Sequence, residues 1–281
     1  MKLGLALGGG GARGLAHIPM LEVFDELGIR PHRIAGTSIG AVIGAMYASG
    51  MSGRRIREIV WQMTAVSPRG QFLAAWKEKK KAPRWVEFFD VDFSRKGLFR
   101  GDRFIAFLYE TMGTPTFETL VIPLTVVTTD FWTGKPVVLS TGPLMAAVKA
   151  SMGLPGFFTP VTLDGRVLID GGGVNPVPYD LLFDECDIVV AIDVTGRPKA
   201  MTPGVPGPLR SVMHMFDILQ SSIMQAKLDR HRPDLYLRPD ITDIQVLDFF
   251  KVDEIFRQAE PARLALREAL LSWQASVKPA S

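Results

Sequence analysis

The sequence Gly36-Thr37-Ser38-Ile39-Gly40 lies between a strand-like stretch at 32–35 (HRIA) and an apolar stretch at 41–48 (AVIGAMYA). It is a G-x-S-x-G pattern, in which a sharp strand-to-helix turn projects the serine hydroxyl and two glycines let the backbone pass closely. The pattern is short enough to arise by chance, and its other interpretation is an ordinary turn with a solvated serine. Because a strand precedes it and a helix follows, we interpret Ser38 as a nucleophile on an elbow framed by Gly36 and Gly40.

A glycine-rich loop at 8–14 (GGGGARG) follows a predicted strand at 2–7 (KLGLAL) and opens a helix predicted from about Ala12 to a stop at Gly28. Glycine N–H groups at the start of a helix bind negative charge. A Walker A loop is excluded because no Gly-Lys-Ser/Thr follows, and a dinucleotide fingerprint fits the glycine spacing but lacks the acidic residue after the second strand. The remaining ligand is the oxyanion that forms when a serine attacks a carbonyl. Two successive strands that end in these motifs are neighbours in a parallel sheet, which favours the oxyanion interpretation.

A nucleophilic serine requires a general base, and the usual partner is histidine. Only His214 and His231 lie downstream of Ser38, the first in a Met-rich apolar helix and the second between two arginines. The stronger candidate is Asp170 in RVLIDGGG, because it ends an apolar strand at the edge that carries the other two motifs. Its other interpretation is a plain Asp-Gly turn.

The remaining sequence alternates predicted strands and helices. Strands are expected at 122–128, 135–139, 166–170 and 187–194, and helices at about 142–151, 209–229 and 253–273, with Ser52 as the cap of the helix after Gly50. This alternation predicts an α/β fold with a parallel or mixed sheet covered on both faces. Residues 70–101 and 196–208 are interpreted as excursions from this α/β core, and both are too short to be domains. Residues 1–281 are therefore expected to form one domain.

Composition narrows the classes of function. Hydrophobic residues make up 47% and charged residues 22% of the 281 residues, as in ordinary globular proteins. The net charge of +3 and the absence of zinc-finger or RNP patterns argue against nucleic acid as a partner. One cysteine, Cys186, and four scattered histidines exclude an intrachain disulfide and argue against a structural metal site.

The amino terminus resembles a short signal peptide, but its apolar run ends in glycines and Arg13. We therefore interpret it as the first strand of a protein that stays in the cytoplasm, and no run is long enough to span a membrane. Residues 76–89 (WKEKKKAPRWVEFF) combine aromatic and basic side chains, which predicts peripheral contact with the inner membrane surface. The alternative for this segment is a solvated basic loop with its aromatic rings in the core.

Several motifs in this order resemble those of the bacterial patatin-like phospholipases. They are GGGGARG, GTSIG and DGG, together with GLFRG at 97–101, TTDFWTGKPV at 128–137, ASMGLPGFFTPV at 150–161 and DFFKVDEIFRQ at 248–258. The resemblance therefore covers nearly the whole chain. It implies a three-layer α/β/α sandwich with a mostly parallel central sheet and a Ser-Asp dyad that works without histidine, metal or cofactor.

Carried over by position, the resemblance makes Ser38 the nucleophile and Asp170 the base. It assigns the oxyanion loop to Gly9, Gly10, Gly11 and Arg13. The expected substrate is a lipid or another carboxylic ester, cleaved as by a phospholipase A or a lysophospholipase. Two glycines around Pro155, Gly153 and Gly156, depart from the family's pattern and leave the shape of the acyl pocket open. An acyltransferase on the same site and a non-catalytic regulatory protein with the same fold remain alternatives.

Overall fold

The two strands that end in the glycine and serine motifs are neighbours at the centre of the sheet. In the computed structural model, β1 (Leu3–Leu7) and β2 (Arg33–Thr37) pair in parallel, with Leu7 opposite Gly36. The structure describes residues 2–64, 100–113, 116–197, 205 and 207–277. The expected parallel neighbourhood of the two motifs is therefore confirmed.

The described strands form one mixed sheet in the order β5-β6-β3-β2-β1-β7-β8, with β4 paired to β3. The four pairings β3–β2, β2–β1, β1–β7 and β7–β8 are parallel, whereas β4, β5 and β6 pair antiparallel. The further strands are β3 (Leu124–Asp130), β4 (Pro136–Leu139), β5 (Val161–Leu163), β6 (Arg166–Asp170), β7 (Ile188–Ile192) and β8 (Leu235–Leu237). The predicted α/β class and mostly parallel sheet are confirmed. Strands β5 and β8 were not predicted, because three residues are too few to show a periodic pattern.

Strand β3 brings the ends of two other strands together. Val126 pairs with both Gly36 and Leu139, so β2 and β4 lie on opposite sides of β3. Thr128 pairs with both Val137 and Asp170, so β6 also lies opposite β4. Strands β2 and β6 therefore lie on the same side of β3 and meet end to end, Thr37 opposite Val127 and Asp170 opposite Thr128.

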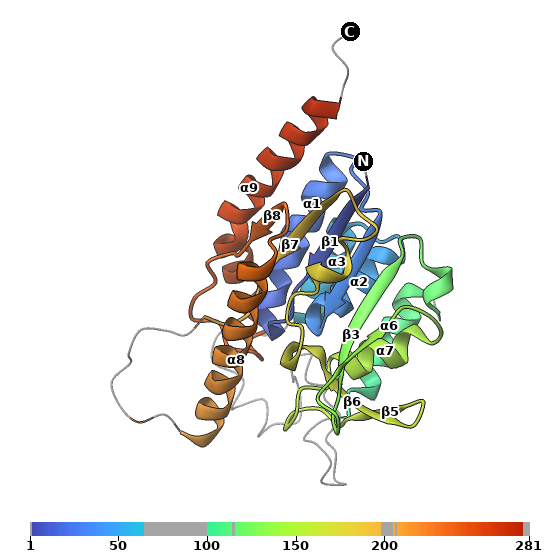
Figure 1. Ribbon diagram of the computed structural model, residues 1–281, viewed down its shortest axis with the longest axis vertical. Coiled ribbons are helices and arrows are strands. Elements are labelled where there is room, and N and C mark those ends of the chain that lie inside the picture. Colours follow the sequence, from blue (N-terminus) through green and yellow to red (C-terminus); the bar gives the residue numbers. More distant parts are fainter. Residues whose placement is uncertain (1, 65–99, 114–115, 198–204, 206, 278–281) are drawn as a thin grey trace.

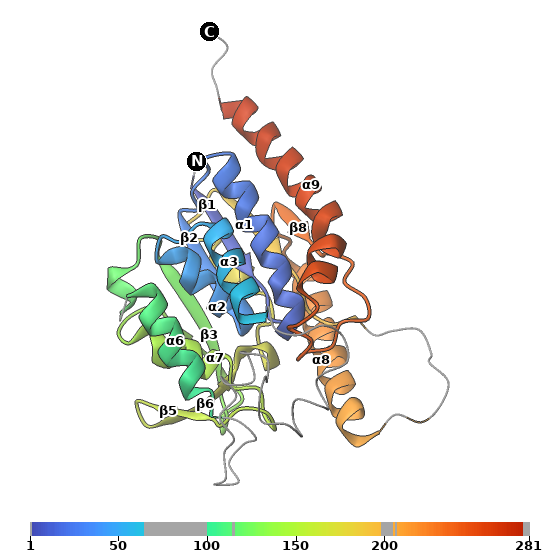
Figure 2. The same cartoon turned by 180° about the vertical axis from the view of Figure 1, so that it is seen from behind.

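Helices cover both faces of the sheet, as Figures 1 and 2 show from opposite sides. Side chains alternate between the faces, so Leu5 and Leu7 join the larger core while Ala6 joins a smaller one with Tyr179 and Met224. The helices are α1 (His17–Glu26), α2 (Ile39–Ala48), α3 (Gly53–Thr64), α6 (Asp102–Met112), α7 (Leu144–Ser151), α8 (Pro208–Arg230) and α9 (Val252–Val277), with short 3₁₀ turns η1 (Gly11–Ala16), η2 (Phe117–Thr119), η3 (Gly171–Gly173) and η4 (Tyr179–Leu181). In Figure 2, α1 and α3 lie over the face opposite α8. Within the described ranges, none of the helices combines the length and the apolar character of a membrane span.

The first predicted helix differs from the prediction in its opening turns. Residues from Gly11 to Ala16 form the 3₁₀ helix η1, and the α-helix begins only at His17. Pro19 explains the break, because it has no N–H to donate to a carbonyl four residues back and is tolerated only in the first turn of an α-helix. The predicted stop is confirmed, since Gly28 adopts φ +63° after the helix ends.

The other predicted helices occur near their predicted positions, and Ser52 caps α3 by accepting the Arg55 N–H at 3.2 Å. Helix α6 was not predicted, because it directly follows the stretch interpreted as an excursion. Most of that excursion (70–101), including residues 76–89, lies outside the described residues, as does most of 196–208.

Candidate active site

Ser38 occupies a strained turn between β2 and α2. Its backbone has φ 55° and ψ −123°, a conformation that residues with side chains rarely adopt and that structures retain where function requires it. The backbone also passes closely on both sides: a Cβ atom on Gly36 would lie 2.6 Å from the Gly40 carbonyl oxygen. A Cβ atom on Gly40 would lie 2.1 Å from the Leu7 carbonyl oxygen. Both positions therefore require glycine for packing, as the elbow interpretation predicts.

A buried serine fixes the backbone of the elbow. The Ser38 N–H donates to Ser151 Oγ at 2.8 Å, and the Ser151 hydroxyl donates to the Val127 carbonyl at 2.7 Å. Ser151 ends α7 and is fully buried. Ser151 was not predicted as a site residue, although it lies within the ASMGLPG stretch. A serine that ends an apolar helix inside that motif is the signal that could have identified it.

Asp170 lies beside Ser38 because β6 ends where β2 ends. The carboxylate is 4% exposed, and its Oδ1 accepts the Gly172 N–H at 2.7 Å. The Asp170 backbone is fixed as well, since its N–H donates to the Gly153 carbonyl at 3.1 Å and its carbonyl accepts from the Thr129 hydroxyl at 2.8 Å. The sequence placed Asp170 at the correct edge, but β6 runs antiparallel to β3 and reaches that edge from the opposite direction.

Burial raises the pKa of Asp170 from 3.8 to about 6. A side-chain hydrogen bond with Ser38 and the bond from Gly172 lower the pKa but do not offset the burial. The carboxylate is therefore a stronger base than an exposed aspartate, and it is in hydrogen-bond contact with the Ser38 side chain.

The two glycines that depart from the family's pattern have separate structural reasons. A Cβ atom on Gly153 would lie 2.9 Å from the Ala150 carbonyl oxygen and 3.4 Å from the Ile169 Cα, so glycine lets this segment lie directly against β6. Gly156 has φ +84° in a turn with open space around it. Gly153 thus packs tightly against β6.

The glycine loop lies against Ser38. A Cβ atom on Gly9 would lie 3.2 Å from the Ser38 Cβ, which sets how closely the loop approaches. The Gly9 N–H donates to the Pro176 carbonyl at 2.9 Å, and the Ala12 N–H donates to the Val246 carbonyl at 2.8 Å. The N–H groups of Gly10 and Gly11 lie at the start of the 3₁₀ helix η1, ahead of the first donors that such a helix bonds internally. These two amides therefore remain available to an external acceptor, and the assignment of the oxyanion loop to Gly9, Gly10, Gly11 and Arg13 stays a prediction.

Two side chains hold the loop in place. His17 is fully buried, and its Nε2 donates to the Gly8 carbonyl at 2.8 Å. Burial lowers the pKa of His17 to about 4, so the ring is neutral at physiological pH. Arg13 is buried and donates to Asp217 of α8 at 3.1 Å, which ties the loop to that helix. His17 lies upstream of Ser38 and was not predicted from the sequence to be a functional residue.

Ser38, Asp170, Arg13 and the three loop glycines line one cavity. Its empty space is ≈ 1310 Å³, with the open solvent at its mouth included. Most of the remaining wall is apolar and comes from α2, α3, α6, α8 and the loops at 152–158 and 246–249, with Met46, Val60, Phe107, Leu154, Phe216 and Phe249 among the lining side chains. The cavity therefore presents a half-buried serine and a buried carboxylate at one point of a largely apolar wall.

Neither downstream histidine lies at this site. His214 is exposed on α8, and His231 stacks on Phe183 with ring centroids 4.0 Å apart, at the far end of α8. The cavity-lining Gln220 precedes His231 by 11 residues, or roughly 16 Å along a helix. In the part of the chain that the structure describes, no cluster of His, Cys, Asp and Glu is suited to hold a metal ion.

Comparison with known proteins identifies several relatives. Residues 5–183 match the model of a family described as patatin-like phospholipase. An uncharacterised NTE family protein of Mycobacterium tuberculosis is 31% identical over 239 residues, which cover 82% of this chain and 61% of the relative. The neuropathy target esterase sws of Drosophila melanogaster is 34% identical over 197 residues, which cover 69% of this chain and 13% of that protein.

The chain thus spans less than two thirds of the length of these relatives. Among solved structures, VipD from Legionella pneumophila aligns with 94% of this chain and 66% of its own, at 14% identity and a TM-score of 0.48.

Proposed function

Since the chain belongs to the patatin-like phospholipase family, we propose that it is a serine hydrolase that cleaves lipid esters, of the phospholipase A or lysophospholipase type. The observation that carries this proposal is the contact between Ser38, held at a positive φ, and Asp170, a buried carboxylate with its pKa raised to about 6. A strained serine beside a basic carboxylate is the arrangement that nucleophilic catalysis requires.

In the proposed mechanism, Ser38 Oγ attacks the ester carbonyl carbon while its proton passes to Asp170. The oxyanion that forms is stabilised by the N–H groups of Gly10 and Gly11, which belong to the loop that His17 and Arg13 hold. The leaving alcohol takes the proton from Asp170, and an acyl-enzyme remains on Ser38. Water then attacks the acyl carbon, gives its proton to Asp170, and releases the carboxylic acid as the proton returns to Ser38.

The cavity supports a lipid as the substrate class. Aliphatic and aromatic side chains form most of its wall, and Ser38 and Asp170 are placed together at one point of it. An acyl chain gains free energy by leaving water for such a wall, roughly 0.8 kcal/mol for each buried methylene group. The same surroundings exclude water from Asp170, which is the reason for its raised pKa.

Two alternatives use the same site. An acyltransferase would pass the acyl group of Ser38 to an alcohol instead of water, and a product assay with competing alcohols separates the two reactions. A non-catalytic regulatory protein could keep the fold, but it would have no use for the strained Ser38 conformation or the buried Asp170 carboxylate.

The test of the proposal is labelling with a fluorophosphonate followed by peptide mass spectrometry. The adduct is expected on Ser38, in the peptide that contains residues 36–40, and is expected to be absent from Ser38→Ala. Ser52→Ala is the matched control, because this serine caps α3 by its side chain and does not line the cavity. Labelling that persists in Ser38→Ala would remove Ser38 as the nucleophile. A panel of phospholipids and lysophospholipids then defines the substrate.

A further inference from the structure

Helix α8 carries an exposed apolar stripe. Val212, Met215 and Leu219 are separated by three and four residues, so they lie on one side of the helix, and all three are more than half exposed. Ile218 extends the stripe. Large apolar groups that face solvent together mark binding surfaces in soluble proteins.

Another side of the same helix forms part of the cavity wall. Met213, Phe216 and Gln220 line the cavity beside Ser38 and Asp170. The acidic residues of α8 are Asp217 and Asp229, and Asp217 is paired with Arg13. The half of α8 next to the cavity is therefore apolar on two sides and presents no unpaired acidic side chain.

A second exposed apolar group lies on the turn between β3 and β4. Trp132 is 78% exposed, and its ring packs edge-on against Phe131 with centroids 4.9 Å apart. The turn is held in shape by Asp130, whose Oδ1 accepts the N–H groups of Trp132 and Thr133 at 3.0 Å each. The two aromatic rings are thus fixed in an exposed position by a defined turn.

The two groups lie at the same end of the molecule. In Figures 1 and 2, the first turns of α8 and the carboxyl end of β3 both lie at the lower end, and the turn at 131–135 continues from β3. Because Thr128 of β3 pairs with Asp170, this is also the end at which the cavity is built. One wall of the cavity comes from α8 and another from the 152–158 loop and the end of β6.

We propose that the Phe131–Trp132 turn and the exposed α8 stripe form a docking face for the surface of a phospholipid membrane, with the cavity between them. The proposal rests on the proposed lipid hydrolase function and is independent of residues 76–89. The apolar stripe continues into an apolar cavity, so a lipid drawn out of a membrane stays in contact with apolar groups on its way to Ser38. Tryptophan favours the interface between headgroups and acyl chains, and the exposed Lys135 at the end of the turn suits an anionic surface, whereas the charge of Arg166 is directed at Asp130.

The experiment measures co-sedimentation with vesicles of phosphatidylcholine and phosphatidylglycerol, in the Ser38→Ala protein so that no lipid is consumed. The turn variant is Phe131→Ser with Trp132→Ser, and the helix variant is Val212→Gln with Met215→Gln and Leu219→Gln. The matched control is Leu264→Gln with Leu271→Gln, two exposed leucines of α9. All these side chains are exposed, and thermal melts verify that every variant is folded.

Each docking variant is expected to lower the partition coefficient at least about tenfold, at low and high salt alike, because apolar insertion is not screened. The control is expected to bind like the parent protein. Brominated lipids are expected to quench Trp132, so quenching decreases in Trp132→Phe.

Binding by both docking variants equal to that of the control would overturn the proposal. So would a helix variant that changes the protein from dimer to monomer while vesicle binding stays the same, since a second copy would then occupy the stripe. Dependence of binding on both groups supports docking whatever the activity. Hydrolysis of a soluble short-chain ester by the protein with Ser38 intact tests the proposed function separately.

Discussion

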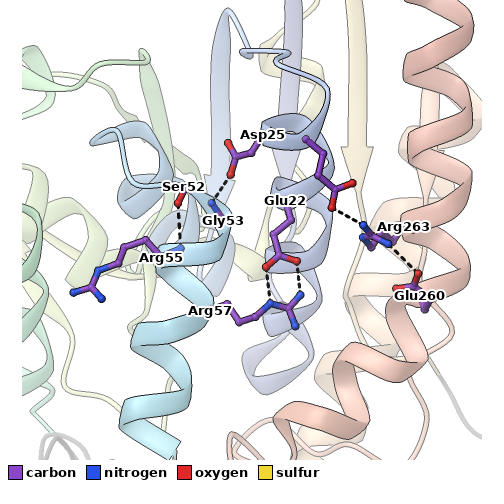
Figure 3. A network of polar contacts seen from close by, with 9 residues as sticks. Glu22, Asp25, Ser52, Gly53, Arg55, Arg57, Glu260 and Arg263 are labelled. Atoms are coloured by element: carbon purple, nitrogen blue, oxygen red, sulfur yellow. Dashed lines mark hydrogen bonds and ion pairs between the residues drawn. The ribbon is translucent and has the colours of Figure 1, made fainter.

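The end of the sheet that carries Ser38 and the face formed by α1, α3 and α9 use charged groups in opposite ways. At the first, Asp170 is buried among apolar groups, and its ionised form is unfavourable, as its raised pKa shows. At the second, ion pairs join neighbouring helices near the surface: Arg57 of α3 forms a double contact with Glu22 of α1, and Arg263 of α9 contacts Glu26 at 2.6 Å (Figure 3). Of these two regions, the one with the proposed chemistry is the one that holds a carboxylate whose ionisation costs stability.

The largest expected effect is the loss of activity in Asp170→Asn. Asparagine keeps an acceptor for the Gly172 N–H but cannot take a proton from Ser38, so kcat/KM is expected to fall at least about 1,000-fold, or about 4 kcal/mol. Steady-state hydrolysis of a soluble ester measures it. The control variant replaces His214 and His231 together by alanine and is expected to keep its activity. A collapse in that control would indicate a histidine base and would contradict the dyad.

The pH profile of the unaltered protein tests the same group. Asp170 must be ionised to accept a proton, and its pKa is about 6. The value of kcat/KM is therefore expected to rise with pH to a plateau, with a midpoint near 6. An ordinary exposed aspartate would give a midpoint near its usual value of 3.8, and that result would show that the carboxylate is not held in a dry cavity.

The next effect separates two glycines of one helix. In Gly40→Ala the new Cβ atom would lie 2.1 Å from the Leu7 carbonyl oxygen. Because this oxygen belongs to the backbone of β1, no side-chain movement can relieve the clash. Gly44→Ala meets only side-chain carbons at 3.3–3.4 Å, and alanine favours helix by up to about 1 kcal/mol. Urea unfolding is expected to show a loss of several kcal/mol for Gly40→Ala and little change for Gly44→Ala. Equal stabilities would show that the elbow does not need this close approach.

Those positions also show why this end of the molecule could be predicted from sequence. Ser38, Asp170 and the glycines belong to short motifs whose residue types are required by the local backbone geometry. The motifs therefore predict the turns in which these residues lie. The antiparallel direction of β6 was not predicted, because the residue pattern of a single strand does not indicate whether it pairs parallel or antiparallel with its neighbour. Ser151 and His17 were missed since each acts through side-chain contacts with backbone groups that only the folded chain brings next to it.

The α1–α3–α9 face was predictable only as amphipathic helices. The pairs of Glu22 with Arg57 and of Glu26 with Arg263 join residues 35 and 237 positions apart, and nothing in the spacing of charges along a helix indicates such partners. Tertiary packing determines them, and packing is not visible in a single sequence. The exposed apolar stripe on α8 could likewise not be predicted from sequence, because the exposure of an apolar helix side depends on which other elements cover it.

A smaller effect concerns stability against pH. The folded pKa of Asp170, about 6, lies above its ordinary 3.8, so its stabilising contribution is complete below 3.8 and is lost as pH rises through 6. The folded pKa of His17, about 4, lies below its ordinary 6.5, so its contribution is complete above 6.5 and is lost as pH falls through 4. Each difference corresponds to at most about 3 kcal/mol.

Asp170→Asn is therefore expected to be more stable than the parent protein above pH 6 and similar to it near pH 4. His17→Gln keeps an N–H donor for the Gly8 carbonyl, and its stability relative to the parent protein is expected to increase as pH falls from 6.5 to 4. Thermal melts across pH 4–8 measure both differences. Parallel stability curves for the parent and both variants would show that neither group is held as the structure has it.

The smallest expected effect belongs to the ion-pair face. The Arg57 guanidinium contacts both carboxylate oxygens of Glu22 and stacks 4.1 Å from the Phe256 ring, so Arg57→Lys keeps the charge but loses the double contact and the stacking. A loss of about 1–2 kcal/mol in urea unfolding is expected, with kcat/KM for a soluble ester unchanged. Arg55→Ala is the matched control, since this exposed residue of the same helix pairs only with Glu58 among the described residues and such pairs contribute little. Arg57→Lys could instead lower activity while the fold stays intact. The α1–α3–α9 face would then be coupled to the Ser38 end of the sheet, and the contrast between the charged groups of the two regions would not hold.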